Sequence, residues 1–264
     1  MKQRVITGIV AGAVFLLFLF LGKWYFTCLI MLAAAVGYTE FSRMNREPPF
    51  KLTGLLGLIL CLFLTFPLRE LSDNDQLHAE TAVWIGMFLL FALTVVTKNK
   101  VTIDRVALAV LGAVYIGFGF HYMIATLAGS NGLFWSLLLY CCIWGSDTGA
   151  FFAGRAFGKR RLWPAISPNK TVEGALGGIL VSIAVAVVFS LIMPALLVWH
   201  KAIWLGLLIA VLGQAGDLIQ SAYKRVRGLK DTGAIFPGHG GVLDRCDSWL
   251  IVFPFVQLLG LIPL

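Results

Sequence analysis

Long apolar segments recur along the whole chain, and short polar connections separate them. Each segment is close to the 20 or so apolar residues that a helix needs to cross the hydrocarbon core of a bilayer. The pattern therefore predicts an all-α polytopic membrane protein with about nine transmembrane helices. A count of eight or ten stays open if the last helix is re-entrant or one segment is split. The expected helices are 5–21, 24–41, 52–68, 82–97, 106–127, 133–153, 174–198, 202–222 and 248–263.

Composition and charge support this interpretation and add an orientation. The chain is 59% hydrophobic and only 13% charged, which excludes an ordinary soluble surface. All but three of its 21 Lys and Arg residues fall on one side of the predicted helices, the exceptions being Lys23, Arg69 and Lys201. Because basic connections are retained on the cytoplasmic side, the N-terminus is expected in the cytoplasm and the protein in the cytoplasmic (inner) membrane.

Polar chemistry is concentrated in the second half of the chain. Residues 1–104 are expected to form a scaffold of transmembrane helices, and residues 105–264 a catalytic region with cytoplasmic loops at 154–173 and 223–247. One carboxylate of the scaffold, Glu40, precedes Arg43 by three residues. Residues at that spacing share a helix face, so a local ion pair is the favoured interpretation of Glu40.

Two aspartates lie inside predicted helices. Asp147 follows Trp-Gly-Ser, and Asp217 follows Gly-Gln-Ala-Gly. Carboxylates at membrane depth are costly, and they normally face a wet cavity or a protein interior. A structural hydrogen bond between helices is the alternative for Asp147. Asp217, Ser221 and Lys224 are spaced to share one face of their helix.

The segment 224–247 combines basic residues, glycines and carboxylates. Lys and Arg bind phosphate oxygens, and glycines let backbone N–H groups approach an anion closely. Asp244 and Asp247 are three residues apart, so both could meet Asp217 at one cation, and hard carboxylate oxygens suit magnesium. A second candidate phosphate site begins at Ser167, which is expected to cap a helix with Pro168 in its first position and Lys170 close behind.

Taken together, these segments resemble the phosphatidate cytidylyltransferase family, also called CDP-diacylglycerol synthases. The resemblance departs from the usual pattern only conservatively, at Phe151 and Cys246. It is carried by Trp144-Gly145, Asp147 to Ala150, Gly154-Arg155, Phe157-Gly158, Ile166 to Pro168, Lys170-Thr171, Glu173-Gly174, Ser221, Lys224-Arg225, Lys230-Asp231, Gly233, Phe236-Pro237, His239 to Gly241, Asp244-Arg245 and Asp247.

The resemblance implies an enzyme that transfers CMP from CTP to phosphatidic acid and releases pyrophosphate. It implies a polar cavity in the C-terminal half, open to the cytoplasm and lined by Asp147 and Asp217. Expected metal ligands for Mg²⁺ are Asp217, Asp244 and Asp247, with Asp147 and Asp231 as further candidates and a second cation left open. The catalytic group is expected to comprise Asp217, Lys224, Asp244 and Asp247, and the substrate-binding group Ser167, Lys170, Arg225, Lys230, His239 and Arg245.

Other classes of function fit less of the sequence. In an ion-coupled transporter, Asp147 and Asp217 would carry cations, but the segment 224–247 would have no role. A CDP-alcohol phosphotransferase would need an Asp-Gly-x-x-Ala-Arg pattern that the sequence lacks. A purely structural scaffold would need no buried aspartates. The expected partners are CTP, phosphatidic acid and membrane lipids, with no nucleic acid; a homodimer is left open.

Overall fold

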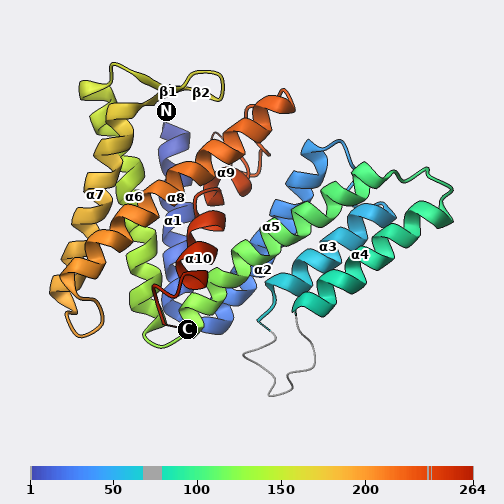
Figure 1. The fold of residues 1–264 in the computed structure, drawn as a ribbon, viewed down its shortest axis with the longest axis horizontal. Coiled ribbons are helices and arrows are strands. Elements are labelled where there is room, and N and C mark those ends of the chain that lie inside the picture. Colours follow the sequence, from blue (N-terminus) through green and yellow to red (C-terminus); the bar gives the residue numbers. More distant parts are fainter. Residues whose placement is uncertain (1, 68–78, 237, 239, 264) are drawn as a thin grey trace. The chain divides into compact units, whose positions relative to one another are not determined.

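The computed structural model describes residues 2–67, 79–236, 238 and 240–263, and most of them are helical (Figure 1). The chain divides into two compact units, each made of two stretches of sequence. The first unit comprises Met1–Ala128 and Asp231–Cys246, and the second comprises Gly129–Lys230 and Asp247–Leu264. The division into a scaffold and a catalytic region stays a sequence-based prediction.

The regular elements of the first unit are all helices in its described residues, and loops connect them. One buried apolar cluster lies where α4 packs near α5 and includes Leu90, Leu93, Val106 and Ala109. Its helices are α1 (Lys2–Leu21), α2 (Lys23–Met44), α3 (Leu52–Thr65), α4 (Ala79–Val96), α5 (Ile103–Ala128) and the single turn α9 (Leu243–Cys246).

The second unit holds four helices and a small antiparallel hairpin. An aromatic cluster joins α6 to α10: the Tyr140 ring lies 5.0 Å from Trp249 and 4.9 Å from Phe253, centroid to centroid. The elements are α6 (Gly132–Phe157), β1 (Arg161–Trp163), β2 (Ser167–Thr171), α7 (Val172–Ile192), α8 (Trp199–Val226) and α10 (Trp249–Leu258).

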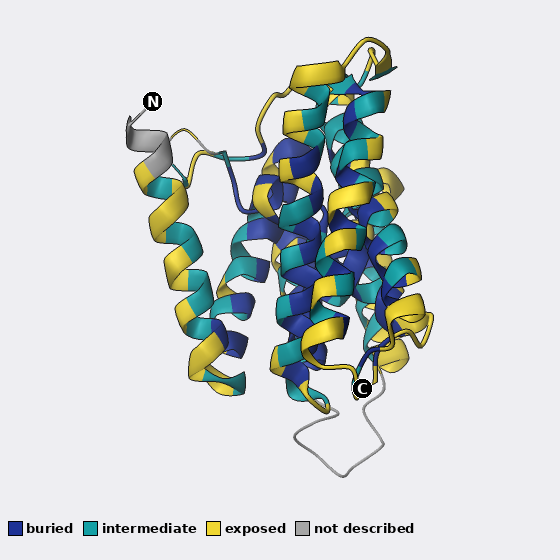
Figure 2. Cartoon of the chain, turned by 90° about the vertical axis from the view of Figure 1, so that its left-hand side faces the viewer, coloured by how far each residue is buried: buried dark blue, intermediate teal, exposed yellow. Residues whose placement is uncertain are grey.

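Among the residues that the structure describes, six helices are long and apolar enough to cross a membrane: α2, α4, α5, α6, α7 and α8. Exposed residues recur along the helices that face the viewer in Figure 2. In α4 the side chains of Trp84, Phe88 and Val95 are 71%, 71% and 76% exposed. Such continuous apolar exposure is what lipid chains, rather than water, would cover. The prediction of a mostly helical membrane protein is confirmed at this level.

Two of the helix ends that differ from the predicted ones lie just before prolines. The helix expected to reach residue 198 ends at Ile192, two residues before Pro194, and the one expected to reach residue 68 ends at Thr65, two residues before Pro67. Proline disfavours helical backbone in the residue that precedes it, so both helices stop early.

The prediction that Ser167 caps a helix is wrong. Ser167 lies in β2, which pairs with β1 through Arg161 with Thr171 and Trp163 with Ser167. The cap of α7 is Thr171, whose hydroxyl accepts a hydrogen bond from the Gly174 N–H at 3.1 Å. The hairpin satisfies the backbone groups of this segment, and the helix begins only where its cross-strand pairing ends.

Candidate functional site

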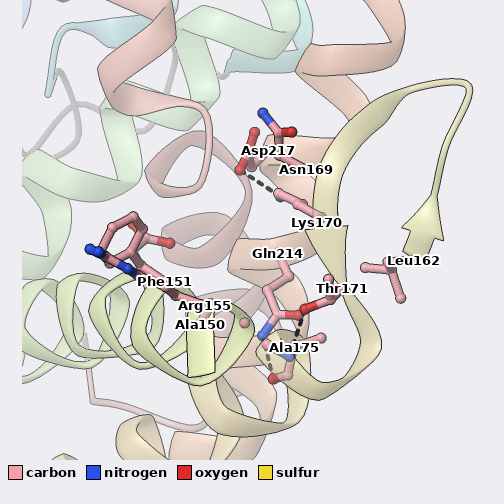
Figure 3. Close-up of a pocket in the computed structure, with 13 residues that line it drawn as sticks. Ala150, Phe151, Arg155, Leu162, Asn169, Lys170, Thr171, Ala175, Gln214 and Asp217 are labelled. Carbon is pink, nitrogen blue, oxygen red and sulfur yellow. Dashed lines mark hydrogen bonds and ion pairs between the residues drawn. The ribbon is translucent and has the colours of Figure 1, made fainter. Parts of the chain in front are cut away.

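A cavity of about 530 Å³ lies within the second unit (Figure 3). Its walls come from α6, the hairpin, the first turn of α7 and the middle of α8. They combine carboxylate, basic and amide groups with small apolar side chains, as expected of a site that binds a polar ligand. The lining residues are Asp147, Ala150, Phe151, Gly154, Arg155, Leu162, Asn169, Lys170, Thr171, Gly174, Ala175, Gln214 and Asp217.

An ion pair between Asp217 and Lys170 crosses the cavity. The Lys170 Nζ lies 2.5 Å from Asp217 Oδ2, and Figure 3 shows the two side chains pointing toward one another from α8 and β2. The Ser221 hydroxyl donates to Asp217 Oδ1 at 3.2 Å, so the predicted shared face of Asp217 and Ser221 is confirmed. Asp217 is thus held between the Lys170 ammonium group and the Ser221 hydroxyl.

Asp247 adds a second carboxylate just before α10. It accepts a hydrogen bond from the Ser248 N–H at 2.8 Å. Burial, and next the negative charges of Asp217 and Asp147, raise the pKa of Asp247 to about 7, against the opposing effects of that hydrogen bond and of Lys224. A bound cation would be stabilised beside Asp247, because its positive charge would offset the negative charges that raise this pKa.

The hairpin that carries Lys170 is fixed to α7 by Glu173. The Glu173 carboxylate accepts from the backbone N–H groups of Lys159, at 3.0 Å, and Arg160, at 3.2 Å to the same oxygen. Arg225 reaches the hairpin from α8, because its Nε donates to the Ile166 carbonyl at 3.3 Å. These bonds hold Lys170 and its neighbour Asn169 at the cavity.

Helices α6 and α7 approach closely beside the cavity. A Cβ added at Gly177 would overlap Ala153, and one added at Gly149 would lie 2.6 Å from Val181 Cγ2 and 2.9 Å from the Gly177 carbonyl oxygen. Small residues at such a contact let two membrane helices pack backbone to backbone. This close packing sets the position of Asp147, which α6 carries two residues before Gly149.

In the first unit, residues 231–236, 238 and 240–242 lead toward α9, and we call them the C-terminal loop. Asp244 is 9% exposed, and its Oδ2 accepts from the Thr232 N–H at 2.7 Å, the Thr232 hydroxyl at 2.9 Å and the Gly241 N–H at 2.9 Å. Asp231 and Arg245, next to these buried groups, are exposed. Asp244 is therefore held by the loop that surrounds it.

The predicted site residues fall into two groups. The second unit holds Asp147, Ser167, Lys170, Asp217, Lys224, Arg225, Lys230 and Asp247. Within this group, an ion pair connects Lys170 to Asp217. Asp231, Asp244 and Arg245 lie in the first unit. His239 lies outside the described residues. Within the described parts of the chain, no three His, Cys, Asp or Glu side chains form a metal-binding group.

Sequence reasoning missed four residues. Arg155, Asn169 and Gln214 line the cavity, and the Gln214 amide donates to the Ala175 carbonyl at 3.1 Å. Gln214 precedes Asp217 by three residues, a spacing that predicts a shared helix face. Glu40 was interpreted as a partner of Arg43. In the structure the carboxylate of Glu40 is instead bound by the C-terminal loop, and Arg43 is exposed.

The sequence matches known proteins across almost the entire chain. The sequence profile of the cytidylyltransferase family matches residues 2–262. A phosphatidate cytidylyltransferase of Bacillus subtilis is 41% identical, over 98% of this chain and 97% of the relative. Those of Staphylococcus epidermidis and Staphylococcus haemolyticus are each 36% identical, over 98% of both chains.

Proposed function

The chain belongs to the cytidylyltransferase family, and from this premise we propose that it transfers CMP from CTP to phosphatidic acid. The products are CDP-diacylglycerol, a precursor of phospholipids, and pyrophosphate. The observation that carries the proposal beyond family membership is the cavity of the second unit, where Asp217 faces Lys170. One side chain there suits a cation, and the other suits a phosphate.

The reaction is a displacement at phosphorus. A phosphate oxygen of the lipid attacks the α-phosphorus of CTP, and the bond from that phosphorus to the oxygen bridging it to the β-phosphorus breaks. No protein residue has to accept a proton, and the electrons of the broken bond leave with pyrophosphate. The residues therefore act by positioning the substrates and by their charge. Lys170, Arg155 and Asn169 at the cavity would hold phosphate oxygens of the two substrates.

Asp217 and Asp247 would hold Mg²⁺, with Asp147 beside them. Burial, and next the negative charges of Asp217 and Asp147, raise the pKa of Asp247, so these residues fit a divalent cation. Magnesium commonly takes only one or two protein carboxylates and fills its other positions with water and substrate phosphates, so a group of three protein ligands is not required. When bound, the metal supplies positive charge to the transferring and leaving phosphates.

The remaining site residues keep the roles that the sequence predicts. Lys224, Arg225 and Lys230 would contact phosphates of CTP or of the lipid, and Ser167 would add a polar contact beside Lys170. Asp231, Asp244, Arg245 and His239 belong to the sequence that forms or flanks the C-terminal loop, with Asp231 and Asp244 as further candidate metal ligands and Arg245 and His239 as candidate nucleotide contacts.

We infer further that nine segments enter the membrane, with the N-terminus in the cytoplasm. The six long helices and three shorter apolar helices, at Ile6–Leu21, Leu52–Thr65 and Trp249–Leu258, support this count within the described residues. The distribution of Lys and Arg supports the orientation. The site then faces the cytoplasm, the source of CTP, from the inner membrane that holds the lipid. A homodimer stays an open prediction.

The proposal is tested with purified protein in mixed micelles. Labelled CTP, Mg²⁺ and phosphatidic acid are incubated with the protein, and CDP-diacylglycerol and pyrophosphate are measured. Equal amounts of both products are expected, and neither is expected when phosphatidic acid is omitted. If both substrates remain unchanged while proteoliposomes of the same protein accumulate an ion, the transporter interpretation holds instead.

A further inference from the structure

Glu40 is a buried carboxylate in α2, far in sequence from every predicted site residue. It is 3% exposed, and both of its oxygens accept hydrogen bonds from the C-terminal loop and the start of α9. The Val242 N–H donates to Oε1 at 2.9 Å, and the Leu243 N–H donates to Oε2 at 3.0 Å. A buried carboxylate that accepts from backbone N–H groups fixes the backbone that donates to it.

Two glycines of the loop make this contact possible. A Cβ added at Gly241 would overlap both oxygens of Glu40, and one added at Gly233 would lie 2.5 Å from Oε1. The loop backbone therefore passes directly over the carboxylate on two sides. A residue that served only as a local ion-pair partner would not require two distant glycines.

Thr232 links Glu40 to Asp244. Its hydroxyl lies 3.1 Å from Glu40 Oε2 and 2.9 Å from Asp244 Oδ2. A hydroxyl has one proton, so it donates to one of the two carboxylates at a time. The hydrogen bonds from backbone N–H groups do not depend on that proton. Val242 and Leu243 donate to Glu40, and Thr232 and Gly241 donate to Asp244.

We propose that Glu40 is a positioning residue for the transfer reaction, because it fixes the C-terminal loop in the conformation that binds CTP. The inference rests on the proposed function. Glu40 touches no substrate and acts through the loop. The exposed Asp231 directly precedes Thr232, which binds Asp244. The exposed Arg245 directly follows Asp244. When the backbone at Thr232 and Asp244 is fixed, the positions from which the charged side chains of Asp231 and Arg245 extend are fixed as well.

The first test compares Glu40→Gln with wild type in steady-state kinetics. Glutamine keeps one acceptor oxygen and presents an NH₂ group to a backbone N–H, so one of the two loop bonds is lost. The KM for CTP is expected to rise about tenfold, the size of effect seen when a supporting partner is removed, while the KM for phosphatidic acid stays the same. A smaller folded fraction alone would lower kcat and leave both KM values unchanged.

The second test measures backbone hydrogen exchange of the same proteins. Peptides covering residues 240–246 are expected to exchange faster in Glu40→Gln, and peptides of α6, α7 and α8 at the wild-type rate. The matched control is Glu47→Gln, the same substitution in the same unit, where the carboxylate pairs with Arg105 at 2.8 Å. This control is expected to leave both the exchange of the loop and the KM for CTP unchanged.

A variant of the loop itself keeps the proposal testable if Glu40→Gln does not fold. Gly241→Ala places a methyl group against the Glu40 carboxylate and leaves α2 intact. It is expected to raise the KM for CTP and to speed exchange at residues 240–246. A wild-type KM for CTP, or faster exchange spread evenly over α2 to α5, would overturn the positioning role in either variant. If wild type makes no CDP-diacylglycerol, the proposed function fails, and exchange alone decides whether Glu40 fixes the loop.

Discussion

Single residues at the cavity show how charge is arranged before any substrate binds. Lys170 neutralises Asp217, and Ser221 orients the same carboxylate from one turn further along α8. For Asp247, burial and the negative charges of Asp217 and Asp147 raise the pKa in spite of the opposing charge of Lys224. A cation bound beside Asp247 would offset the negative charges that raise its pKa.

Replacing Asp217 with asparagine is expected to lower kcat by about 10²–10³-fold, the range found when one preorganised electrostatic group is removed from an active site. The side chain keeps its size but can no longer hold a cation through a charged oxygen. The measurement is CDP-diacylglycerol formation at saturating CTP and Mg²⁺. Asp104→Asn, an exposed aspartate in the first turn of α5, is the control and should retain full activity. Wild-type turnover in Asp217→Asn would remove Asp217 from the mechanism.

Replacing Asp247 with asparagine is expected to raise the thermal midpoint of the metal-free protein at pH 8. The pKa of this carboxyl is about 7 in the folded chain against an ordinary value of 3.8, so folding favours its protonated form. Its stability contribution is fully present below pH 3.8 and is lost as the pH rises through 7. The gain in midpoint should therefore shrink toward pH 4. Thermal unfolding of the two proteins in chelator at both pH values measures this, and an equal gain at pH 4 and pH 8 would rule out the charge as its cause.

At the scale of elements, the length of the apolar segments predicted the helices well but gave no indication of the hairpin. Apolar length alone located the helices, because membrane helices must satisfy their own backbone. The hairpin residues 161–171 contain Ser-Pro, a frequent helix start, and only pairing between β1 and β2 reveals that the helix begins at Val172. The true cap, Thr171, lies just before Glu173, a signal that sequence reasoning passed over.

The site was predictable where its residues share a helix and unpredictable where they do not. Spacing along α8 brought Asp217 and Ser221 together, but no spacing rule relates Lys170 to Asp217, or Glu40 to Val242. Those contacts depend on how closely the elements that carry the two residues pack together. Glycines report such packing indirectly, since Gly177 and Gly241 stand where a side chain would collide with a neighbour.

Substituting Gly177 with alanine is expected to destabilise the contact of α6 with α7. The added methyl group would overlap Ala153, and overpacking of this kind costs about 1–3 kcal/mol. A lower thermal midpoint and reduced activity are expected, because the same helices carry the walls of the cavity. Gly12→Ala in α1 is the matched control, since its Cβ would meet nothing within 4 Å. Equal midpoints for the two variants would show that α6 and α7 have room to separate without cost.

At the scale of the whole chain, the placement of Lys159 and Lys201 relative to the membrane decides whether the site meets its soluble substrate. Lys159 lies between α6 and β1, before α7, and Lys201 lies in the first turn of α8, after α7. A single long apolar helix therefore separates them, and the two lysines should face opposite compartments. The distribution of basic residues predicts that Lys159 is cytoplasmic and Lys201 is outside.

This orientation is measured by labelling Lys159→Cys and Lys201→Cys with an impermeant maleimide in intact cells, in a background where the five native cysteines are replaced. Lys201→Cys should react in intact cells, and Lys159→Cys only after the membrane is permeabilised. Permeabilised cells are the control, because both positions must react there for the comparison to count. The reverse pattern would place the cavity of the second unit on the side that lacks CTP, and the cytidylyl transfer proposed for this chain would then lose its soluble substrate.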